Sequence, residues 1–431
     1  MRSQKIEIAF GRSHVPLNLP PNALPHVIRK AALPKLPDPH LAVRQALESP
    51  VGAPPLSELA QGKQSACILI CDITRPVPNR LFLRPMVETM VASGIPLERI
   101  TILVATGLHR PNLGDELAEL VGDPWVMNNV RIENHYARDD DMHLDLGFTD
   151  KRQVPIRLDR RLVNAELKIS TGLVEPHFMA GWSGGRKVVA PGVAHHTTIR
   201  TFHSARFMED PLAVQCNLVG NPLHEEQLDI VRKLGPVYAL NTVLDEDRDL
   251  AHVNFGEVIE SHLGAVAFVQ DVSQVKVPRK FKTVVTSSAG YPLDKTYYQT
   301  VKGMVTPLDI LEPGGTLIMA SECSEGFGSP KFKDAQARLV ELGPERFLQT
   351  LTAKSLAEID EWQTEMQLKT MRLGHIQMFT TGLDQEERRI TGVEIVPSLD
   401  EAVAAALARH QDDAVAVIPE GPYVIPIHAP A

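Results

Sequence analysis

Short runs of apolar residues alternate with segments of helical spacing along most of the chain. The runs 66–71 (ACILIC), 100–105 (ITILVA) and 166–170 (ELKIS) have the length expected of buried strands. Residues 80–93 carry apolar side chains at helical spacing and stop before Gly94. This alternation predicts an α/β fold, with a mostly parallel sheet and helices on both of its faces.

A second pattern of the same kind follows in the last third of the chain. Residues 282–287 (KTVVTS), 315–320 (GTLIMA) and 414–418 (AVAVI) are typical of strands, and residues 294–311 and 401–409 are typical of helices. The sequence therefore predicts a second α/β domain.

Polar residues at 272–280 separate the two patterns, so we place the domain boundary there. We expect an N-terminal α/β domain at 1–274 and a C-terminal α/β domain at 275–412, with the active site in the cleft between them. The pattern leaves open whether the tail, about 413–431, returns to the first domain. Ten prolines in residues 15–55 predict an extended segment with neither a central strand nor a long helix.

Composition narrows the possible partners. The chain has 431 residues and a formal net charge of -9, which argues against a nucleic-acid or anionic-membrane partner but not against one small basic pocket. Its four cysteines show no C-x-x-C spacing and are too few for a disulfide framework, which favours a reducing compartment. No apolar stretch approaches a signal peptide or a membrane span, so we expect a cytoplasmic protein.

Unusual polar segments follow the first three predicted strands, where open parallel sheets bind their ligands. After the first strand, Pro76 and Pro78 delay the next helix and leave Asp72, Thr74 and Arg75 on a loop. An arginine in such a loop is able to hold a carboxylate through two parallel hydrogen bonds. The alternative is a plain ion pair between Asp72 and Arg75.

The second strand leads into Thr106-Gly107-Leu108-His109-Arg110-Pro111. A histidine just past a buried strand is well placed for acid–base chemistry at neutral pH, so His109 is a candidate catalytic residue. The alternative is that His109 caps the helix expected after Pro111.

The third strand leads into the segment richest in candidates. His177 follows Glu175-Pro176, and residues 183–187 read SGGRK. Paired glycines allow close approach of the backbone to a ligand, and Arg186 and Lys187 add positive charge, so the loop suits a phosphate. Its spacing fits neither a P-loop nor a dinucleotide fingerprint. The alternative is a surface turn with two incidental cations.

Further histidines lie downstream of this loop. His203 falls in a plausible helix, where a lone histidine is more often structural than a ligand. We expect His195 and His196 to form a solvated turn, although imidazole is also a metal ligand.

One more cluster opens the helix expected after residues 282–287. Tyr298 and Lys302 are four residues apart and so share a helix face that is able to reach into a cleft. The alternative is an exposed tyrosine ring packed on a lysine stem.

Taken together, these segments resemble the lactate racemase family that uses a nickel-pincer nucleotide. The resemblance rests on DITRP at 72–76, GLHRP at 107–111, EPHFMAGWSGGRK at 175–187, the downstream His203 and the YQxVK run at 298–302. It extends from about residue 65 to about residue 365, with the segments in the family's order.

The resemblance implies a role for each matching residue. Lys187 is implied to bind covalently a pyridinium-3-thioamide-5-thiocarboxylate mononucleotide, His203 to ligate its nickel, and His109 and His177 to act as catalytic acid–bases. It places the substrate against Arg75, Gln299, Lys302 and Trp362. With the loop pattern, it assigns further cofactor contacts to Asp72, Thr74, Ser183, Gly184, Gly185, Arg186 and Tyr298.

The implied function is a racemase or epimerase that inverts the C2 centre of a 2-hydroxy acid by reversible hydride transfer. Hydride transfer avoids an unstable carbanion, and two opposed histidines provide one base for each substrate hand. Neutral imidazole is also a good ligand for nickel, so the resemblance gives His203 a role separate from acid–base catalysis. The implied partners are the hydroxy acid and the enzymes that mature the cofactor.

Three other readings stay open at this point. A nicotinamide-dependent 2-hydroxy-acid dehydrogenase would share the hydride chemistry, but its fingerprint is missing. A phosphotransferase would need magnesium-binding acids that the sequence does not place. A non-catalytic nucleotide-binding protein would not need paired bases such as His109 and His177. The sequence does not indicate which 2-hydroxy acid is the substrate.

Overall fold

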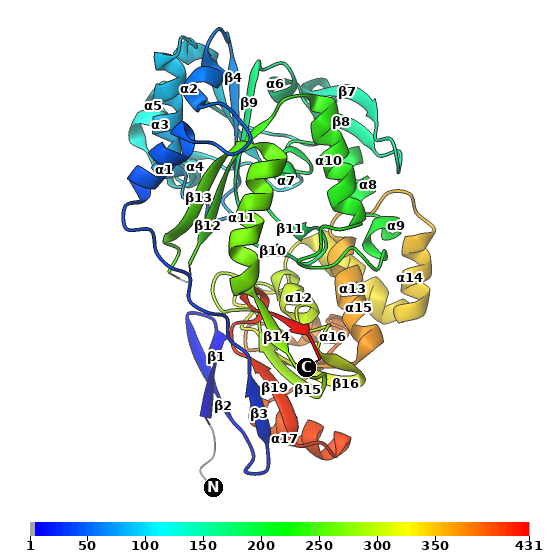
Figure 1. The fold of residues 1–431 in the computed structure, drawn as a ribbon. Helices are drawn as coiled ribbons and strands as arrows, with labels where there is room; N and C mark the ends of the chain where they lie inside the picture. The colour runs from blue at the N-terminus through cyan, green and yellow to red at the C-terminus, as the bar shows by residue number, and fades with distance from the viewer. Residues whose placement is uncertain (1–4, 246, 431) are drawn as a thin grey trace. The chain divides into compact units, whose positions relative to one another are not determined.

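The computed structural model describes residues 5–245 and 247–430, and the chain divides into two compact units (Figure 1). The N-terminal unit comprises Ala32–Phe202 and Asp210–Gln270. The C-terminal unit comprises Met1–Ala31, His203–Glu209 and Asp271–Ala431. Each unit is built on its own six-stranded sheet, which confirms the predicted α/β class with mostly parallel strands.

The sheet of the N-terminal unit has the order β13-β12-β9-β4-β5-β6, and only its β12–β13 pair is antiparallel. Its central strands are the continuous apolar runs of the sequence, and Ile68 and Ile102 are fully buried there. The strands are β4 (Ala66–Cys71), β5 (Ile100–Ala105), β6 (Arg131–Asn134), β9 (Leu167–Leu173), β12 (Tyr238–Leu244) and β13 (Leu250–Glu257).

Helix α1 of this unit begins at an ordinary capping residue. The Asp38 carboxylate accepts a hydrogen bond from the Leu41 amide, and Pro39 occupies the first turn, so a ten-residue helix forms inside the proline-rich segment. The helices are α1 (Pro39–Glu48), α2 (Leu56–Ala60), α3 (Asn79–Ala92), α4 (Gly114–Val121), α5 (Pro124–Asn129), α6 (Arg160–Val163), α7 (Arg186–Val189), α8 (His196–Phe202), α10 (Pro222–Leu234) and α11 (Val258–Ser273). Two small antiparallel pairs join β7 (His143–Phe148) to β8 (Pro155–Asp159) and β10 (Pro176–His177) to β11 (Gly181–Trp182).

The sheet of the C-terminal unit is parallel throughout, in the order β18-β17-β16-β15-β19-β3. Its strands are β3 (Leu24–Val27), β15 (Phe281–Ser287), β16 (Leu311–Ala320), β17 (His375–Phe379), β18 (Glu394–Ile395) and β19 (Ala414–Ile418). Its helices are α9 (Ala205–Met208), α12 (Tyr297–Val305), α13 (Pro330–Leu342), α14 (Pro344–Thr352), α15 (Glu361–Leu373), α16 (Gln385–Ile390) and α17 (Leu399–His410). Two further pairs join β1 (Lys5–Phe10) to β2 (Ser13–Asn18) and β14 (Gln274–Val277) to β20 (Ile425–His428).

The described residues near both ends of the chain belong to the C-terminal unit, which differs from the division expected from the sequence. Residues 5–31 are not part of the expected 1–274 domain, because β3 pairs with β19 at the sheet edge, where Pro25 is tolerated. The tail does not return to the N-terminal unit, because the buried strand β19 pairs with β15 as well. The β1–β2 hairpin packs Ile8 and Leu17 into the core of the same unit.

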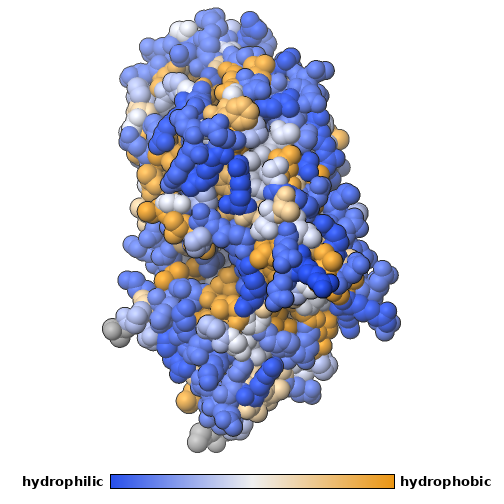
Figure 2. All heavy atoms as spheres, turned by 90° about the vertical axis from the view of Figure 1, so that its right-hand side faces the viewer, coloured by the Kyte–Doolittle hydropathy of each residue, from blue (hydrophilic) through white to orange (hydrophobic). Residues whose placement is uncertain are grey.

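The surface drawn in Figure 2 is largely hydrophilic, with hydrophobic residues in small scattered groups. Within the described residues, no helix combines the length and the apolar character needed to cross a bilayer.

Candidate active site

The three segments singled out in the first half of the sequence meet at one edge of the N-terminal sheet. Strands β9, β4 and β5 are neighbours and run parallel, so their carboxyl ends lie side by side. At this edge, Nδ1 of His109 lies 2.5 Å from Oδ2 of Asp72. The His109 side chain is 58% exposed, so the rest of its ring is accessible to a ligand.

Asp72 is the centre of this first cluster. Its other oxygen accepts hydrogen bonds from the hydroxyl of Thr74 at 2.5 Å and from the Thr74 amide at 3.2 Å. Burial opposes ionisation of Asp72, but the hydrogen bond and charge of His109, with help from Thr74, outweigh it, so the pKa of Asp72 lies below its ordinary value. A carboxylate beside Nδ1 fixes the proton there and leaves Nε2 as the acceptor of His109.

Asp72 bonds His109, and Nε of Arg75 lies 3.8 Å from Oε1 of Glu175. The charge of Arg75 also acts on Asp72, so the role expected of Arg75 stays a prediction. His109 does not cap the following helix, since α4 begins at Gly114 with Leu113 as its N-cap.

His177 and Lys187 form the second cluster. The Nε2 atom of His177 lies 3.1 Å from Nζ of Lys187. Nδ1 of His177 faces the backbone amides of Ala180 at 3.2 Å and Met179 at 3.4 Å. His177 sits in the short β10–β11 pair, and Lys187 lies in the first turn of α7, directly after the glycine pair.

The two glycines are required by packing as well as by conformation. Gly184 has φ +76° and Gly185 has φ +50°, a region that other residues rarely adopt. A Cβ on Gly184 would lie 2.8 Å from Val174, and one on Gly185 would lie 2.9 Å from His262. The amides of Gly184, Gly185 and Arg186 have no hydrogen-bond acceptor among the described residues. Three successive unpaired N–H groups are able to bind an anion such as a phosphate.

Ser183 and Arg186 support this loop from inside the protein rather than facing a ligand. The Ser183 hydroxyl donates to the carbonyl of Leu173 at 2.7 Å. The Arg186 guanidinium, which is 1% exposed, donates to the carbonyl of Ala180 and contacts Nε2 of His262 at 3.0 Å. Both buried side chains already bond protein groups, and the predicted contacts of Ser183 and Arg186 with a cofactor stay a prediction.

The residues singled out in the second half of the sequence cluster in the C-terminal unit. The indole Nε1 of Trp362, on α15, donates to the hydroxyl of Tyr298, on α12, at 3.2 Å. The rings of Trp362 and His203 lie 4.5 Å apart between centroids. Gln299 and Lys302 follow on α12, and the Oε1 atom of Gln299 is buried without a hydrogen-bond partner among the described residues. An orphaned acceptor of this kind is compatible with a ligand contact.

Three histidines differ from their expected settings. His203 is not in a helix but in the turn between α8 and α9. His195 is 1% exposed, and its ring packs on His143 and His196, so His195 and His196 do not form a solvated turn.

Sequence reasoning missed the buried residues that hold the site in place. The ring of His262, on α11, lies beside Gly185, and its Nε2 atom lies 2.8 Å from the carbonyl oxygen of Ser183. The sequence signal was a single histidine within the apolar helical stretch of α11, and nothing in that stretch connects it with residues 183–187.

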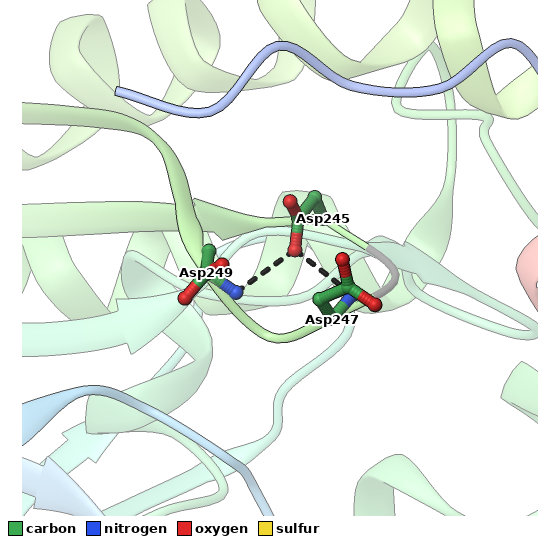
Figure 3. A group of neighbouring side chains, drawn as sticks. All are labelled: Asp245, Asp247 and Asp249. Atoms are coloured by element: carbon green, nitrogen blue, oxygen red, sulfur yellow. Dashed lines mark hydrogen bonds between the residues drawn. The ribbon is translucent and has the colours of Figure 1, made fainter. Parts of the chain in front are cut away.

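An acidic group after β12, formed by Asp245, Asp247 and Asp249, resembles a cation site but is already paired. In Figure 3, Asp245 accepts hydrogen bonds from the amides of Asp247 and Asp249, as in a tight turn. Nζ of Lys35 lies 2.8 Å from Asp247 and 2.7 Å from Asp249. Because Lys35 and backbone amides already bond these carboxylates, we assign no metal to this group.

Comparison with known proteins identifies the class. The lactate racemase N-terminal domain matches residues 10–215, and the lactate racemase C-terminal domain matches residues 277–426. The lactate racemase of Lactiplantibacillus plantarum is 34% identical over 386 residues, which cover 89% of this chain and 90% of that protein. The lactate racemase of Thermoanaerobacterium thermosaccharolyticum is 30% identical over 431 residues, covering 97% and 98%.

Comparison with solved structures gives the same result as the sequence comparisons. The lactate racemase apoprotein from T. thermosaccharolyticum superimposes with a TM-score of 0.91 at 28% identity, covering 98% of this chain and all of that one. A protein from Thermotoga maritima shares the fold with a TM-score of 0.64 at 17% identity, covering 87% and 96%. The protein is therefore an isomerase of the racemase class. The chain belongs to the lactate racemase family, as the sequence motifs predicted.

Proposed function

We propose that the chain inverts the C2 centre of a 2-hydroxy acid, lactate or a close relative, with His109 and His177 as its acid–base pair. The observation that carries this proposal is the His109–Asp72 contact at one strand end, beside the His177–Lys187 contact at the end of the adjoining strands. Both histidines are thereby fixed by protein partners while one nitrogen of His109 stays accessible.

The residues fit a nickel-pincer nucleotide, a pyridinium-3-thioamide-5-thiocarboxylate mononucleotide, which when bound supplies a reversible hydride acceptor. Lys187 provides the amine for its covalent attachment, and the unpaired amides of Gly184, Gly185 and Arg186 suit its phosphate. His203, in the C-terminal unit, provides a neutral imidazole of the kind that binds nickel. Tyr298 and the Asp72–Thr74 pair are proposed as further contacts with this group.

The chain's own residues do the proton chemistry. With its Nδ1 proton held by Asp72, His109 accepts the hydroxyl proton of one substrate hand at Nε2, and the nearby carboxylate stabilises the resulting imidazolium. His177 performs the same task for the other hand. Arg75 and Lys302 are proposed to hold the substrate carboxylate and hydroxyl region, with Gln299 and Trp362 beside them.

The anchor is tested by co-producing the protein with cofactor-maturation enzymes and measuring its intact mass. We expect a nucleotide adduct and bound nickel in the unmodified protein, and neither adduct nor activity in Lys187→Ala. An adduct that persists in Lys187→Ala would refute the anchor assignment.

The acid–base pair is tested by following each enantiomer of lactate separately by chiral chromatography. His109→Ala and His177→Ala should each slow both directions by roughly 10²–10⁴-fold, the usual scale of acid–base catalysis. Full activity of either variant in both directions would rule out its role, and a panel of single-enantiomer 2-hydroxy acids would define the substrate.

A further inference from the structure

Lys187 is paired with an unusual partner for a lysine. Its Nζ atom lies 3.1 Å from Nε2 of His177, which is a ring nitrogen and not a carboxylate. Which of the two atoms carries the proton between them depends on the other nitrogen of the imidazole ring.

The backbone settles the tautomer of His177. Nδ1 lies 3.2 Å from the amide nitrogen of Ala180 and 3.4 Å from that of Met179, and backbone amides only donate. Nδ1 must therefore be the acceptor, so the single proton of the neutral ring is on Nε2, pointing at Lys187. An ammonium group has three donors and no acceptor, so it cannot receive that proton, whereas a neutral amine has a lone pair that can.

A buried positive charge lies next to this pair. The adjacent Arg186 is fully buried, and the carbonyl of Ala180 to which it donates belongs to the residue whose amide faces His177. Within the described part of the chain its hydrogen-bond partners are that carbonyl and His262, with no carboxylate among them. Burial lowers the pKa of Arg186 to about 9, so the guanidinium is still positive at pH 7. Its charge opposes a second positive charge on the adjacent, half-buried Lys187.

We propose that His177 donates a hydrogen bond from Nε2–H to the lone pair of the Lys187 amine, without transferring the proton, and so keeps that amine unprotonated and nucleophilic before any cofactor binds. The inference rests on the proposed function for its purpose, since an unprotonated amine is what covalent attachment of a nucleotide requires. After attachment the nitrogen of Lys187 no longer accepts this hydrogen bond, and His177 is released for its acid–base role.

Cyanate is a suitable probe because it is small and adds to unprotonated amines. The amine nitrogen forms a bond to the carbon of isocyanic acid and its proton moves to the reagent nitrogen, so a urea forms with no leaving group. The protein produced without maturation enzymes is treated at about pH 7 and about pH 10, near the ordinary lysine pKa of about 10.4. Peptide mass spectrometry then gives the labelling rate of Lys187 relative to Lys63, a loop lysine of the same unit.

At about pH 10, the ratio of the Lys187 labelling rate to the Lys63 labelling rate reports how accessible the Lys187 amine is to cyanate. The change in this ratio between about pH 10 and about pH 7 reports the protonation of Lys187. We expect the ratio to rise at least about tenfold at pH 7, the effect of one pKa unit. In His177→Asn, whose side-chain oxygen replaces Nδ1 as the acceptor while nothing replaces the Nε2 proton, this rise should disappear. His177→Phe is the second variant, and His40→Phe, at an exposed position on α1, is the matched control that should behave as the unmodified protein.

An unchanged ratio in the unmodified protein would overturn the proposal. If the labelling ratio still rises at pH 7 in both His177 variants, then His177 is not the residue that keeps Lys187 unprotonated. Neither result depends on nickel, nucleotide or turnover, so failure here is distinct from failure of the racemase proposal.

Discussion

Asp72 determines how His109 presents its ring, because the two side chains share a 2.5 Å contact. Replacing the carboxylate by an amide would keep the size of the side chain while removing its charge. The imidazolium formed during proton transfer would then lose its stabilising partner.

We therefore expect Asp72→Asn to lower kcat by roughly 10²–10⁴-fold with a smaller effect on KM. Thr74→Val removes only a hydroxyl that donates to Asp72 and should change kcat much less. Equal losses in the two variants would contradict the role given to the Asp72 charge.

Gly185 allows a stability test of the loop that carries Lys187. Its φ of +50° and the 2.9 Å approach of a Cβ to His262 both oppose a side chain. Gly185→Ala should reduce the free energy of unfolding by roughly 2–5 kcal/mol, from strain and overpacking together.

Gly62→Ala is the matched control in the same unit, since Gly62 has φ +72° but no atom within 4 Å of its Cβ position. It should cost only the conformational strain, about 1–2 kcal/mol. Urea denaturation of both variants would show whether the difference exists, and equal losses would mean that contact with His262 is unimportant.

At the scale of elements, the β1–β2 hairpin is part of the C-terminal core although it begins the chain. Ile8 is fully buried there, whereas Glu7 on the opposite face of β1 is exposed. Ile8→Ala should cost roughly 2–5 kcal/mol of unfolding free energy, and Glu7→Ala less than about 0.5 kcal/mol. Thermal or urea unfolding is the measurement, and comparable effects of the two changes would argue against docking of the hairpin.

The sequence predicted the interior of both sheets because continuous apolar runs leave few other structures possible. β4, β5 and β19 occur at the predicted residues, and β9 extends its predicted run by three residues to Leu173. β3 was missed, since LPHV is short, contains a proline and pairs with a strand near the other end of the chain. α1 was missed although its signal, Asp38 followed by Pro39, was present.

The parts of the candidate site that lie at strand ends were predictable from the sequence, but the buried residues that support them were not. Parallel strand ends meet by geometry, so the proximity of Asp72 to His109 followed from their positions after β4 and β5. The supporting contacts of Arg186 and His262 did not follow, because helix α11 lies about 80 residues further along the chain and only folding brings it under the loop.

At the scale of the whole molecule, a group of buried histidines makes stability depend on pH. His135, His143 and His195 are nearly inaccessible, and their rings lie 5.0–5.1 Å apart in succession. Burial, with neighbouring positive groups, lowers the pKa of His135 well below 6.5 and that of His195 to about 4. Burial also lowers the pKa of His143.

The unfolded chain therefore binds more protons than the folded one between the ordinary histidine pKa of 6.5 and about 4. The contribution of these neutral histidines to the free energy of unfolding should be fully present above pH 6.5 and should decrease as the pH falls from 6.5 to about 4. Urea midpoints measured between these limits test the slope. His195→Gln should flatten it, while His40→Gln, at an exposed site, should leave it unchanged; an identical slope in all three proteins would refute the assignment.

The pairing of β3 with β19 has a consequence for the order in which the protein is made. Strand β3 emerges from the ribosome early, but its partner β19 emerges roughly 390 residues later. At ordinary translation rates this is a delay of about 20–80 s. During that time the N-terminal unit, whose segments end at Gln270, is already complete. Strand β3 is thus made near the start of synthesis but joins a sheet that is finished only near its end, and until β19 emerges the pairing edge of β3 has no partner strand.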